Sequence, residues 1–463
     1  MQSVRIIGGI EMARERTNRS LVGDAMGQFG LNISTGLVGI MMYYYTDVVG
    51  VSAAVVGTIL MLTKILDAFA DVGMGVLVDR TNSKHGQAKP WLLWMTLPML
   101  ASIILLFSVP DLSSGAKIAY AVVTNLLFFV CVYTPTSIPY NSLMALTTRS
   151  QQDRSLMGLY RAALGYLAGM AVAVGFIPVV NAMGGGRLQW TLLASIYGLI
   201  AALGIYIAFR STKEKYNTTQ LKELGELKKS YSFMTALRLL STNKYWIIIV
   251  TVGLLGNVLF ALSTTSGMYY AKYVWGDVNL VGVMGAIGFI PVVVIFLCSG
   301  PVIKRIGKRN TAIVGLIIGT GGALLRLLDV ESVPLGLVGS ILQSFGIVPL
   351  MIVLMPLLTD TIEYGEWKYG QRIVGLTNSI NSFAQKIGTA LGTAFIGWML
   401  AWGNYKEGAD EQGQSAIQMI IGFEIYIPII VYILIVILLF NFSLDKQYVQ
   451  ILNDLEKRRD PKA

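Results

Sequence analysis

Apolar residues along this chain gather in long continuous runs that are separated by short polar segments. A helix that crosses a bilayer needs about 20 apolar residues, and runs without a period of two exclude a closed β-barrel. The pattern predicts twelve membrane-spanning helices and hence an all-α polytopic membrane protein. We place them at roughly 21–48, 52–79, 91–109, 117–147, 157–183, 188–209, 244–275, 278–303, 311–329, 332–364, 373–402 and 413–442.

The longest polar segment, residues 210–243, divides these predicted helices into two groups of six. Its charged and partly helical pattern is typical of a linker. We therefore expect an N-terminal six-helix half at 1–209, a cytoplasmic linker at 210–243, a C-terminal six-helix half at 244–442 and a cytoplasmic tail at 443–463.

Composition and charge agree with a membrane protein. Only 13% of the 463 residues are charged and 54% are hydrophobic, whereas soluble domains carry about 25% charged residues. The net charge of +10 comes from lysines and arginines that gather in the loops on one side of the predicted spans. This is the positive-inside pattern and not a nucleic-acid footprint. It predicts a bacterial-type inner membrane protein with both termini cytoplasmic, and we expect it to function as a monomer.

The predicted second span carries three charges in an otherwise apolar run. Lys64, Asp67 and Asp71 have the spacing that puts them on one helix face. A charge at the bilayer centre costs roughly 2.5–3.5 kcal/mol on insertion scales, so these side chains are expected to face a cavity. Our hypothesis is that the two carboxylates bind a coupling cation. The alternative is a buried ion-pair cluster that only holds helices together.

Candidate enzyme chemistry is sparse. The chain has one histidine and two cysteines, and we find no nucleophile–base pair, metal-ligand cluster or nucleotide-binding loop in it. We therefore expect neither an enzyme nor a cofactor.

An internal echo supports the division into halves. Gly75, Asp79, Arg80 and Gly86 follow the second predicted span, and a similar glycine and charge pattern follows the eighth, at Gly300, Lys304, Arg305 and Gly307. The pattern resembles the loop motif of the major facilitator superfamily. That resemblance implies a 12-helix bundle whose two six-helix halves rock about a central site.

Several longer stretches resemble the glycoside–pentoside–hexuronide:cation symporter family within that superfamily, and the likeness is closest to the glucuronide carriers and more distant to the melibiose permeases. The stretches are YYYTDVVGVSAAVVGTI (43–59), LDAFADVGMGVLVDRTNSKHGQAKPWLL (66–93), TSIPYNSL (136–143) and DTIEYGEWKYGQRIVGLTNSINSFAQKIG (360–388).

The resemblance implies a cation site at Asp67, Asp71 and Thr134. Hard cations prefer oxygen ligands, and the coupling ion is expected to be H⁺ or Na⁺. Melibiose permeases have an asparagine where this chain has Ala70, which leaves H⁺ open. The implied sugar site consists of Asn32, Tyr133, Ser137, Asn141, Arg161 and Lys386.

Two acids and two aromatic residues of the melibiose permeases are replaced in this chain, by Asn32, Ser137, Asn141 and Met351. A cavity that loses acids but keeps Arg161 and Lys386 favours a sugar that bears a carboxylate. We therefore expect cation-coupled symport of a glycoside, with a glucuronide or other hexuronide as the favoured substrate. Alternatives are a neutral pentoside or disaccharide, charge balance without substrate contact for Arg161 and Lys386, an uncoupled sugar facilitator, and a drug–proton antiporter.

Further charges lie near the ends of the predicted spans. We expect five of them to gate the cytoplasmic side or to bridge the halves, namely Asp79, Arg80, Asp360, Glu363 and Arg372. Lys272, Arg326 and Glu424 are expected to snorkel or to face a loop end.

Overall fold

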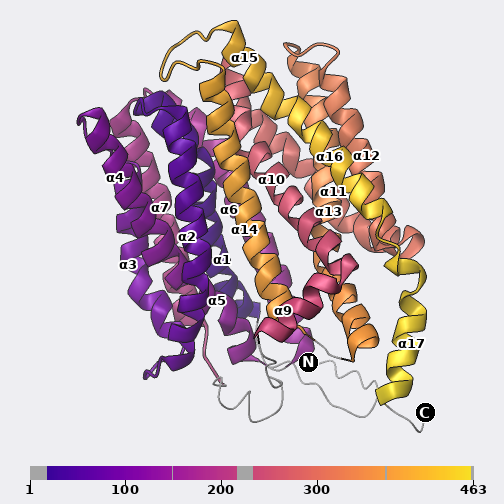
Figure 1. The fold of residues 1–463 in the computed structure, drawn as a ribbon. Helices are drawn as coiled ribbons and strands as arrows, with labels where there is room; N and C mark the ends of the chain where they lie inside the picture. Colours follow the sequence, from indigo (N-terminus) through magenta and orange to yellow (C-terminus); the bar gives the residue numbers. More distant parts are fainter. Residues whose placement is uncertain (1–17, 149, 216–232, 371–372, 460–463) are drawn as a thin grey trace. The chain divides into compact units, whose positions relative to one another are not determined.

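The structure is a computed structural model that describes residues 18–148, 150–215, 233–370 and 373–459. These residues are almost entirely helical, and they contain no β-strand beyond one isolated bridge between Ser83 and Gly86. The fold class predicted from the apolar runs is therefore confirmed (Figure 1).

Helices of the first half of the chain occupy all six of the ranges predicted there. The first and fourth spans each contain a π-helical turn, η1 and η2. The elements are α1 (Asn18–Tyr43), η1 (Tyr44–Val48), α2 (Ala53–Arg80), α3 (Lys89–Leu106), α4 (Ser114–Leu126), η2 (Leu127–Tyr133), α5 (Thr134–Thr147), α6 (Gln151–Ala182) and α7 (Arg187–Ser211).

Helices of the second half likewise fill the six predicted ranges, and a third π-helical turn, η3, interrupts the last span. The elements are α9 (Phe233–Thr242), α10 (Lys244–Tyr273), α11 (Leu280–Ile306), α12 (Lys308–Arg326), α13 (Val333–Tyr369), α14 (Gly375–Trp402), α15 (Gln414–Ile421), η3 (Gly422–Tyr426), α16 (Ile427–Phe440), η4 (Leu444–Lys446) and α17 (Tyr448–Arg459).

Nine helices in the described part of the chain are long and apolar enough to cross a membrane by length and composition. They coincide with nine of the twelve predicted ranges. The remaining three ranges hold α1, α12 and α14, whose polar residues lower their mean hydropathy. In α1 one of these polar residues is Asp24, whose side chain is buried.

The chain forms two compact units that differ from the predicted halves at one place. Unit 1 comprises Met1–Val38 and Leu66–Lys229, and unit 2 comprises Gly39–Ile65 and Ser230–Ala463. The end of α1 and the beginning of α2 therefore pack within unit 2, although they precede the linker by more than a hundred residues. The division of the chain at the linker stays a prediction.

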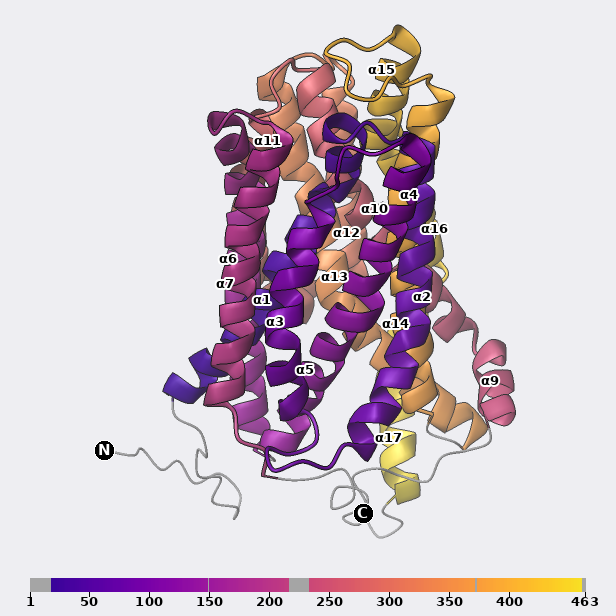
Figure 2. The same ribbon diagram turned by 90° about the vertical axis from the view of Figure 1, so that its left-hand side faces the viewer.

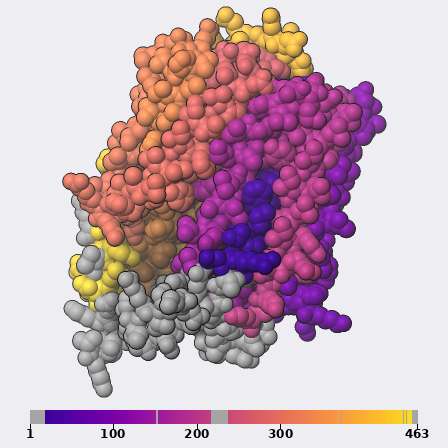
Figure 3. Space-filling view, turned by 180° about the vertical axis from the view of Figure 1, so that it is seen from behind, coloured from indigo at the N-terminus to yellow at the C-terminus, as the bar shows by residue number. Residues whose placement is uncertain are grey.

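Within unit 1, α3 packs along α7 and α5, and the early part of α1 lies against α6 and α7. Figure 2 shows these helices running side by side, and in Figure 3 the indigo atoms of α1 lie among the magenta atoms of α6 and α7. An aromatic cluster of Phe107, Phe176 and Trp190 fills the interior between α3, α6 and α7.

Within unit 2, α12 packs on α13 and α16, and α10 packs on α14. The α10–α14 contact is close because a side chain at Gly388 would lie 2.3 Å from the carbonyl oxygen of Leu254. Two short helices lie at the ends of these longer ones. The linker segment contributes α9, which contacts α10, α13 and α14, and the predicted tail contributes α17, which packs on α13 through the buried side chains of Ile451 and Leu455.

Candidate functional site: acids and bases inside the helices

Asp67, Asp71 and Thr134 lie together in unit 1. The two carboxylates are one turn apart on α2, and the Thr134 hydroxyl on α5 makes a hydrogen bond to Asp67 and lies 3.1 Å from Oδ1 of Asp71. Asp67 and Thr134 are buried, at 4% and 1% exposed, whereas Asp71 is half-buried. The three residues that the resemblance assigned to the cation site thus bring several oxygen atoms to one place.

The local sequence explains how Thr134 reaches the acids. Pro135 has no N–H to donate along the helix and its ring crowds the preceding turn. The helix accommodates it with the π-helical turn Leu127–Tyr133, which ends directly before Thr134. Such turns are frequent at functional sites because they change which side chains share a face. Two acids near one hydroxyl repel each other, and a cation or a proton would relieve that repulsion.

The uncharged residues of the predicted sugar site all lie in unit 1. Asn32 on α1 accepts a hydrogen bond of 2.7 Å from Nε2 of Gln28. Tyr133 ends the π-helical turn before Thr134, and the Ser137 hydroxyl lies 3.5 Å from the carbonyl oxygen of Thr134. Asn141 is exposed, one turn further along α5. Tyr133 directly precedes Thr134 in the chain and Ser137 follows it by one turn of α5, so both lie on the segment that brings the Thr134 hydroxyl to the acids.

Arg161 on α6 is held by an acid that the sequence argument did not consider. Its Nε and Nη2 donate to the two carboxylate oxygens of Asp24, at 2.7 Å and 3.0 Å. Both side chains are buried, with exposed fractions of 6% for Arg161 and 0% for Asp24. The signal for Asp24 was present in the sequence, because an acid inside a predicted span is as expensive there as Asp67.

Lys386 lies on α14 in unit 2 and is half-buried. Whether it contributes to a sugar site with the residues of unit 1 stays a prediction.

The predicted gating residues fall into two groups. Asp79 and Arg80 are exposed at the end of α2. Asp360 on α13 is buried and paired with Lys308, and Glu363 accepts a hydrogen bond from Tyr448 of α17. Arg372 lies outside the described residues.

Arg326 and Glu424 do not snorkel, which corrects the expectation from sequence. They form an ion pair of 2.9 Å inside unit 2, with exposed side-chain fractions of 1% and 8%. Arg326 also donates to Gln343 at 2.8 Å and lies over the ring of Tyr270, while Glu424 contacts Ser266. The position of Arg326 at the last turn of α12 made a loop-end location plausible, but α13 and η3 cover that turn.

Asp47, which follows α1 in the turn η1, is the centre of a second polar cluster that the sequence did not reveal. Its carboxylate accepts hydrogen bonds from Lys272 at 2.7 Å, Tyr273 at 2.5 Å and Tyr405 at 2.7 Å. Burial, and then the neighbouring Tyr269 and Asp47, raise the pKa of Tyr405, so its hydroxyl stays protonated and able to donate. This cluster fastens the α1–α2 connection to α10 and to the loop after α14 within unit 2.

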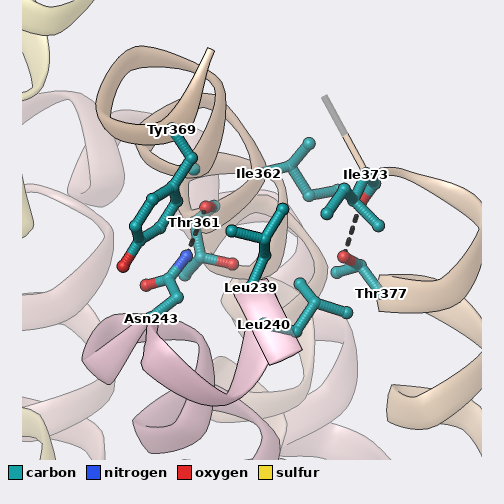
Figure 4. A pocket seen from close by; sticks show the side chains of 9 residues that line it. Leu239, Leu240, Asn243, Thr361, Ile362, Tyr369, Ile373 and Thr377 are labelled. Atoms are coloured by element: carbon teal, nitrogen blue, oxygen red, sulfur yellow. Dashed lines mark hydrogen bonds between the residues drawn. The ribbon is translucent and has the colours of Figure 1, made fainter. Parts of the chain in front are cut away.

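Unit 2 also contains a shallow pocket of about 250 Å³, including its open mouth, where α9 meets α13 and α14 (Figure 4). Asn243 donates from Nδ2 to the carbonyl oxygen of Thr361 at 3.0 Å, and the Tyr369 hydroxyl donates to the carbonyl oxygen of Thr242 at 3.1 Å. None of the described residues that line it carries a charged side chain. It consists of Leu239, Leu240, Asn243, Thr361, Ile362, Gly365, Tyr369, Ile373 and Thr377.

A helical chain with apolar spans, buried acids and buried arginines has the features of a membrane transporter, and comparison with known proteins agrees. The chain belongs to the MFS/sugar transport protein family, whose model matches residues 23–446. The chain is thus a transporter and not an enzyme, and the resemblance stated from sequence is confirmed.

Two curated relatives and one solved structure illustrate the likeness. The chain is 30% identical to an isoprimeverose transporter of Lactiplantibacillus pentosus, over 94% of this chain and 90% of the relative. It is 31% identical to a glucuronide carrier protein homolog of Escherichia coli K12, over 97% of each chain. A bacterial homolog of the human lysosomal transporter Spinster has the same fold, with a TM-score of 0.65 at 13% identity over 95% of this chain and 99% of that one.

Proposed function

We propose that this transporter couples the uptake of a glycoside to the movement of a monovalent cation, H⁺ or Na⁺, by alternating access. The observation that carries the proposal is the convergence of Asp67, Asp71 and Thr134. A cation that neutralises the acids would raise the affinity for sugar, and by reciprocity the sugar would raise the affinity for the cation. We also propose that both termini face the cytoplasm. In the predicted order of spans they lie on the same side as the loops rich in lysine and arginine, and such loops are cytoplasmic.

For the substrate we favour a neutral glycoside. The expectation of a hexuronide relied on Arg161 and Lys386 as cations available to a sugar carboxylate, but Asp24 already accepts from both donors on the bidentate face of Arg161. The name of the isoprimeverose transporter supports the same choice. A hexuronide is the second candidate, supported by the similarity to the glucuronide carrier homolog and by Lys386.

Transport in proteoliposomes tests the coupling. Asp67→Asn is expected to lower sugar accumulation driven by a cation gradient at least tenfold, while exchange of labelled for unlabelled sugar at equal concentrations continues. Asp111→Asn is the matched control, because its carboxylate is 85% exposed and, among the described residues, pairs with Lys117 and Arg187. Unchanged accumulation in Asp67→Asn would contradict coupling at this site and favour an uncoupled facilitator.

The voltage dependence separates the two substrate candidates. One cation carried with a neutral sugar moves one charge, and 100 mV contributes about 2.3 kcal/mol to that movement. Since 1.4 kcal/mol is a factor of ten, voltage alone would concentrate the neutral sugar about fiftyfold. A hexuronide carried with one cation moves no net charge, so an imposed voltage without an ion gradient would not drive its uptake.

A further inference from the structure

Asp24 is an acid without a role in the proposed coupling. It lies on α1, eight residues before Asn32, and is fully buried within unit 1. Its carboxylate accepts from Nε of Arg161 at 2.7 Å, from Nη2 at 3.0 Å and from the Thr212 hydroxyl at 3.3 Å. An arginine engages a carboxylate most strongly in this bidentate arrangement, so Asp24 occupies the face of Arg161 that would otherwise bind a substrate carboxylate.

Tyr140 on α5 fixes the pair from a second side. Its ring lies 3.9 Å from the guanidinium carbon of Arg161, its carbonyl oxygen accepts from Nη2 at 3.3 Å, and its hydroxyl donates to the backbone oxygen of Asp24 at 2.8 Å. Room for the ring exists because residue 27 is glycine, where a side chain would lie 2.4 Å from the Tyr140 ring. The guanidinium on α6 is therefore held by groups of two other helices, α1 and α5, and its Nε and Nη2 point toward Asp24.

Charge neutralisation follows from this geometry. Arg161 is the one charged member of the predicted sugar set in unit 1, since Asn32, Tyr133, Ser137 and Asn141 are all neutral. With Asp24 ionised beside it, the pair has no net charge. An incoming carboxylate would then lose its own hydration without gaining a free cation from unit 1, whereas a hydroxyl-bearing sugar has no charge to desolvate.

We propose that Asp24 determines the charge preference of the transporter for its glycoside: by neutralising Arg161 it selects uncharged sugars, and without its charge the same site accepts a sugar carboxylate. The inference rests on the proposed function. Asp24 acts through Arg161 and is a positioning residue that sets specificity.

The test compares two ligands that differ only at C6, p-nitrophenyl β-glucoside and p-nitrophenyl β-glucuronide. Their dissociation constants are measured by calorimetry on the purified full chain at one fixed cation concentration and pH. Wild type is expected to bind the glucoside more tightly. Asp24→Asn, which keeps the shape but removes the charge, is expected to shift the ratio of the two constants at least tenfold toward the glucuronide.

Three further variants isolate the charge. Asp24→Asn combined with Arg161→Gln removes both charges, so the ratio should return to within about threefold of wild type. Asp24→Glu keeps the charge and should keep the wild-type ratio. Thr212→Val removes the neutral donor to Asp24 and should leave the ratio unchanged.

The outcomes separate the inference from the proposed function. Tighter binding of the glucuronide by wild type, or an unchanged ratio in Asp24→Asn that still binds sugar, would overturn the inference and leave the proposed function standing. If Asp24→Asn does not fold, the double variant decides, because a shift of tenfold or more in its ratio contradicts the inference. Binding of neither ligand by wild type would count against the proposed function itself, and the inference would fall with it.

Discussion

The carboxylate of Asp47 accepts a hydrogen bond of 2.7 Å from the ammonium of Lys272, which lies 225 residues later in the chain. The contact joins the connection between α1 and α2 to the end of α10 inside unit 2. Lys272 also lies over the rings of Tyr43 and Tyr273, at 5.4 Å and 4.8 Å from their centroids. A first-half segment is thus held in unit 2 by one carboxylate and its surrounding tyrosines.

Asp47→Asn is expected to destabilise the protein by about 3 kcal/mol, because removal of one partner of a buried pair leaves the other charge uncompensated. Thermal unfolding in detergent measures the loss. A double-mutant cycle with Lys272→Met should show a coupling energy of about 1–3 kcal/mol. Asp277→Asn serves as the control, because Asp277 is an exposed acid four residues beyond Tyr273. Additive effects of Asp47→Asn and Lys272→Met on the free energy of unfolding would show that the pair is not coupled.

Thr134→Val is expected to weaken the apparent cation affinity for sugar uptake by tenfold or more. The substitution keeps the shape but removes a hydroxyl that contacts both acids, and a hydrogen bond to a charged group contributes roughly 1.5–3 kcal/mol. Thr134→Ser keeps the hydroxyl and should stay close to wild type. The measurement is uptake as a function of cation concentration, and equal affinities for the valine and serine variants would remove Thr134 from the proposed site.

Glu214→Ala should leave the backbone N–H groups at the beginning of α3 without their hydrogen-bond acceptor. The carboxylate of Glu214 accepts from the backbone N–H groups of Gln87, Ala88 and Lys89, at 2.7, 2.9 and 2.6 Å. Loss of this cap is expected to cost about 1–2 kcal/mol. Amide hydrogen exchange at these three residues should accelerate about 5- to 30-fold, and Glu214→Gln should have an intermediate effect.

Gly86→Ala tests the same cap from the other side. Gly86 has a φ of +111°, and an added Cβ would lie 2.3 Å from Oε2 of Glu214. The alanine should therefore destabilise by backbone strain and by displacing the carboxylate. In the Glu214→Ala background only the strain remains, so its cost there should be smaller; equal costs in both backgrounds would rule out the clash.

Glu424→Gln is expected to cost about 3–5 kcal/mol, because it leaves the buried guanidinium of Arg326 without a counter-charge. Replacing both partners, as Arg326→Met with Glu424→Leu, should cost much less than the single change because no buried charge remains. Thermal unfolding of the two variants measures the difference. A double variant as unstable as Glu424→Gln would mean that packing around Arg326, and not its charge, holds this region.

Ile451→Ala should loosen α17 from α13, because Ile451 is 1% exposed and removal of a buried isoleucine side chain costs about 2–5 kcal/mol. Trp367 reports on the contact, since its Nε1 donates to Asp454 at 3.0 Å. Its fluorescence and the cleavage of α17 by a protease should both change, whereas Asn453→Ala, at an exposed position of the same helix, should change neither.

The helices were predictable because each depends on a local property. Long apolar runs require helices in a bilayer, where every backbone polar group must be satisfied within its own segment. For that reason the twelve predicted ranges all contain helices. The cluster of Asp67, Asp71 and Thr134 was reached in part from spacing on α2, and its third member came only through the resemblance.

The ion-pair partner of each buried acid was harder to predict than the position of the acid in a span. Asp24, Asp47 and Glu424 are acids in or beside apolar spans, and the sequence marks each as costly, yet nothing local pairs them with Arg161, Lys272 and Arg326. The members of these pairs are more than 90 residues apart, so the contacts depend on which helices pack together.

Hydrophobicity and helical spacing are properties of short segments, so the order of residues was enough to identify a helical membrane protein and the predicted spans that carry charge. Which charges neutralise one another depends on how distant helices pack, and this is visible in the folded protein alone. The pairing changes the expected substrate, because an arginine already bound to a buried carboxylate is no longer a free cation.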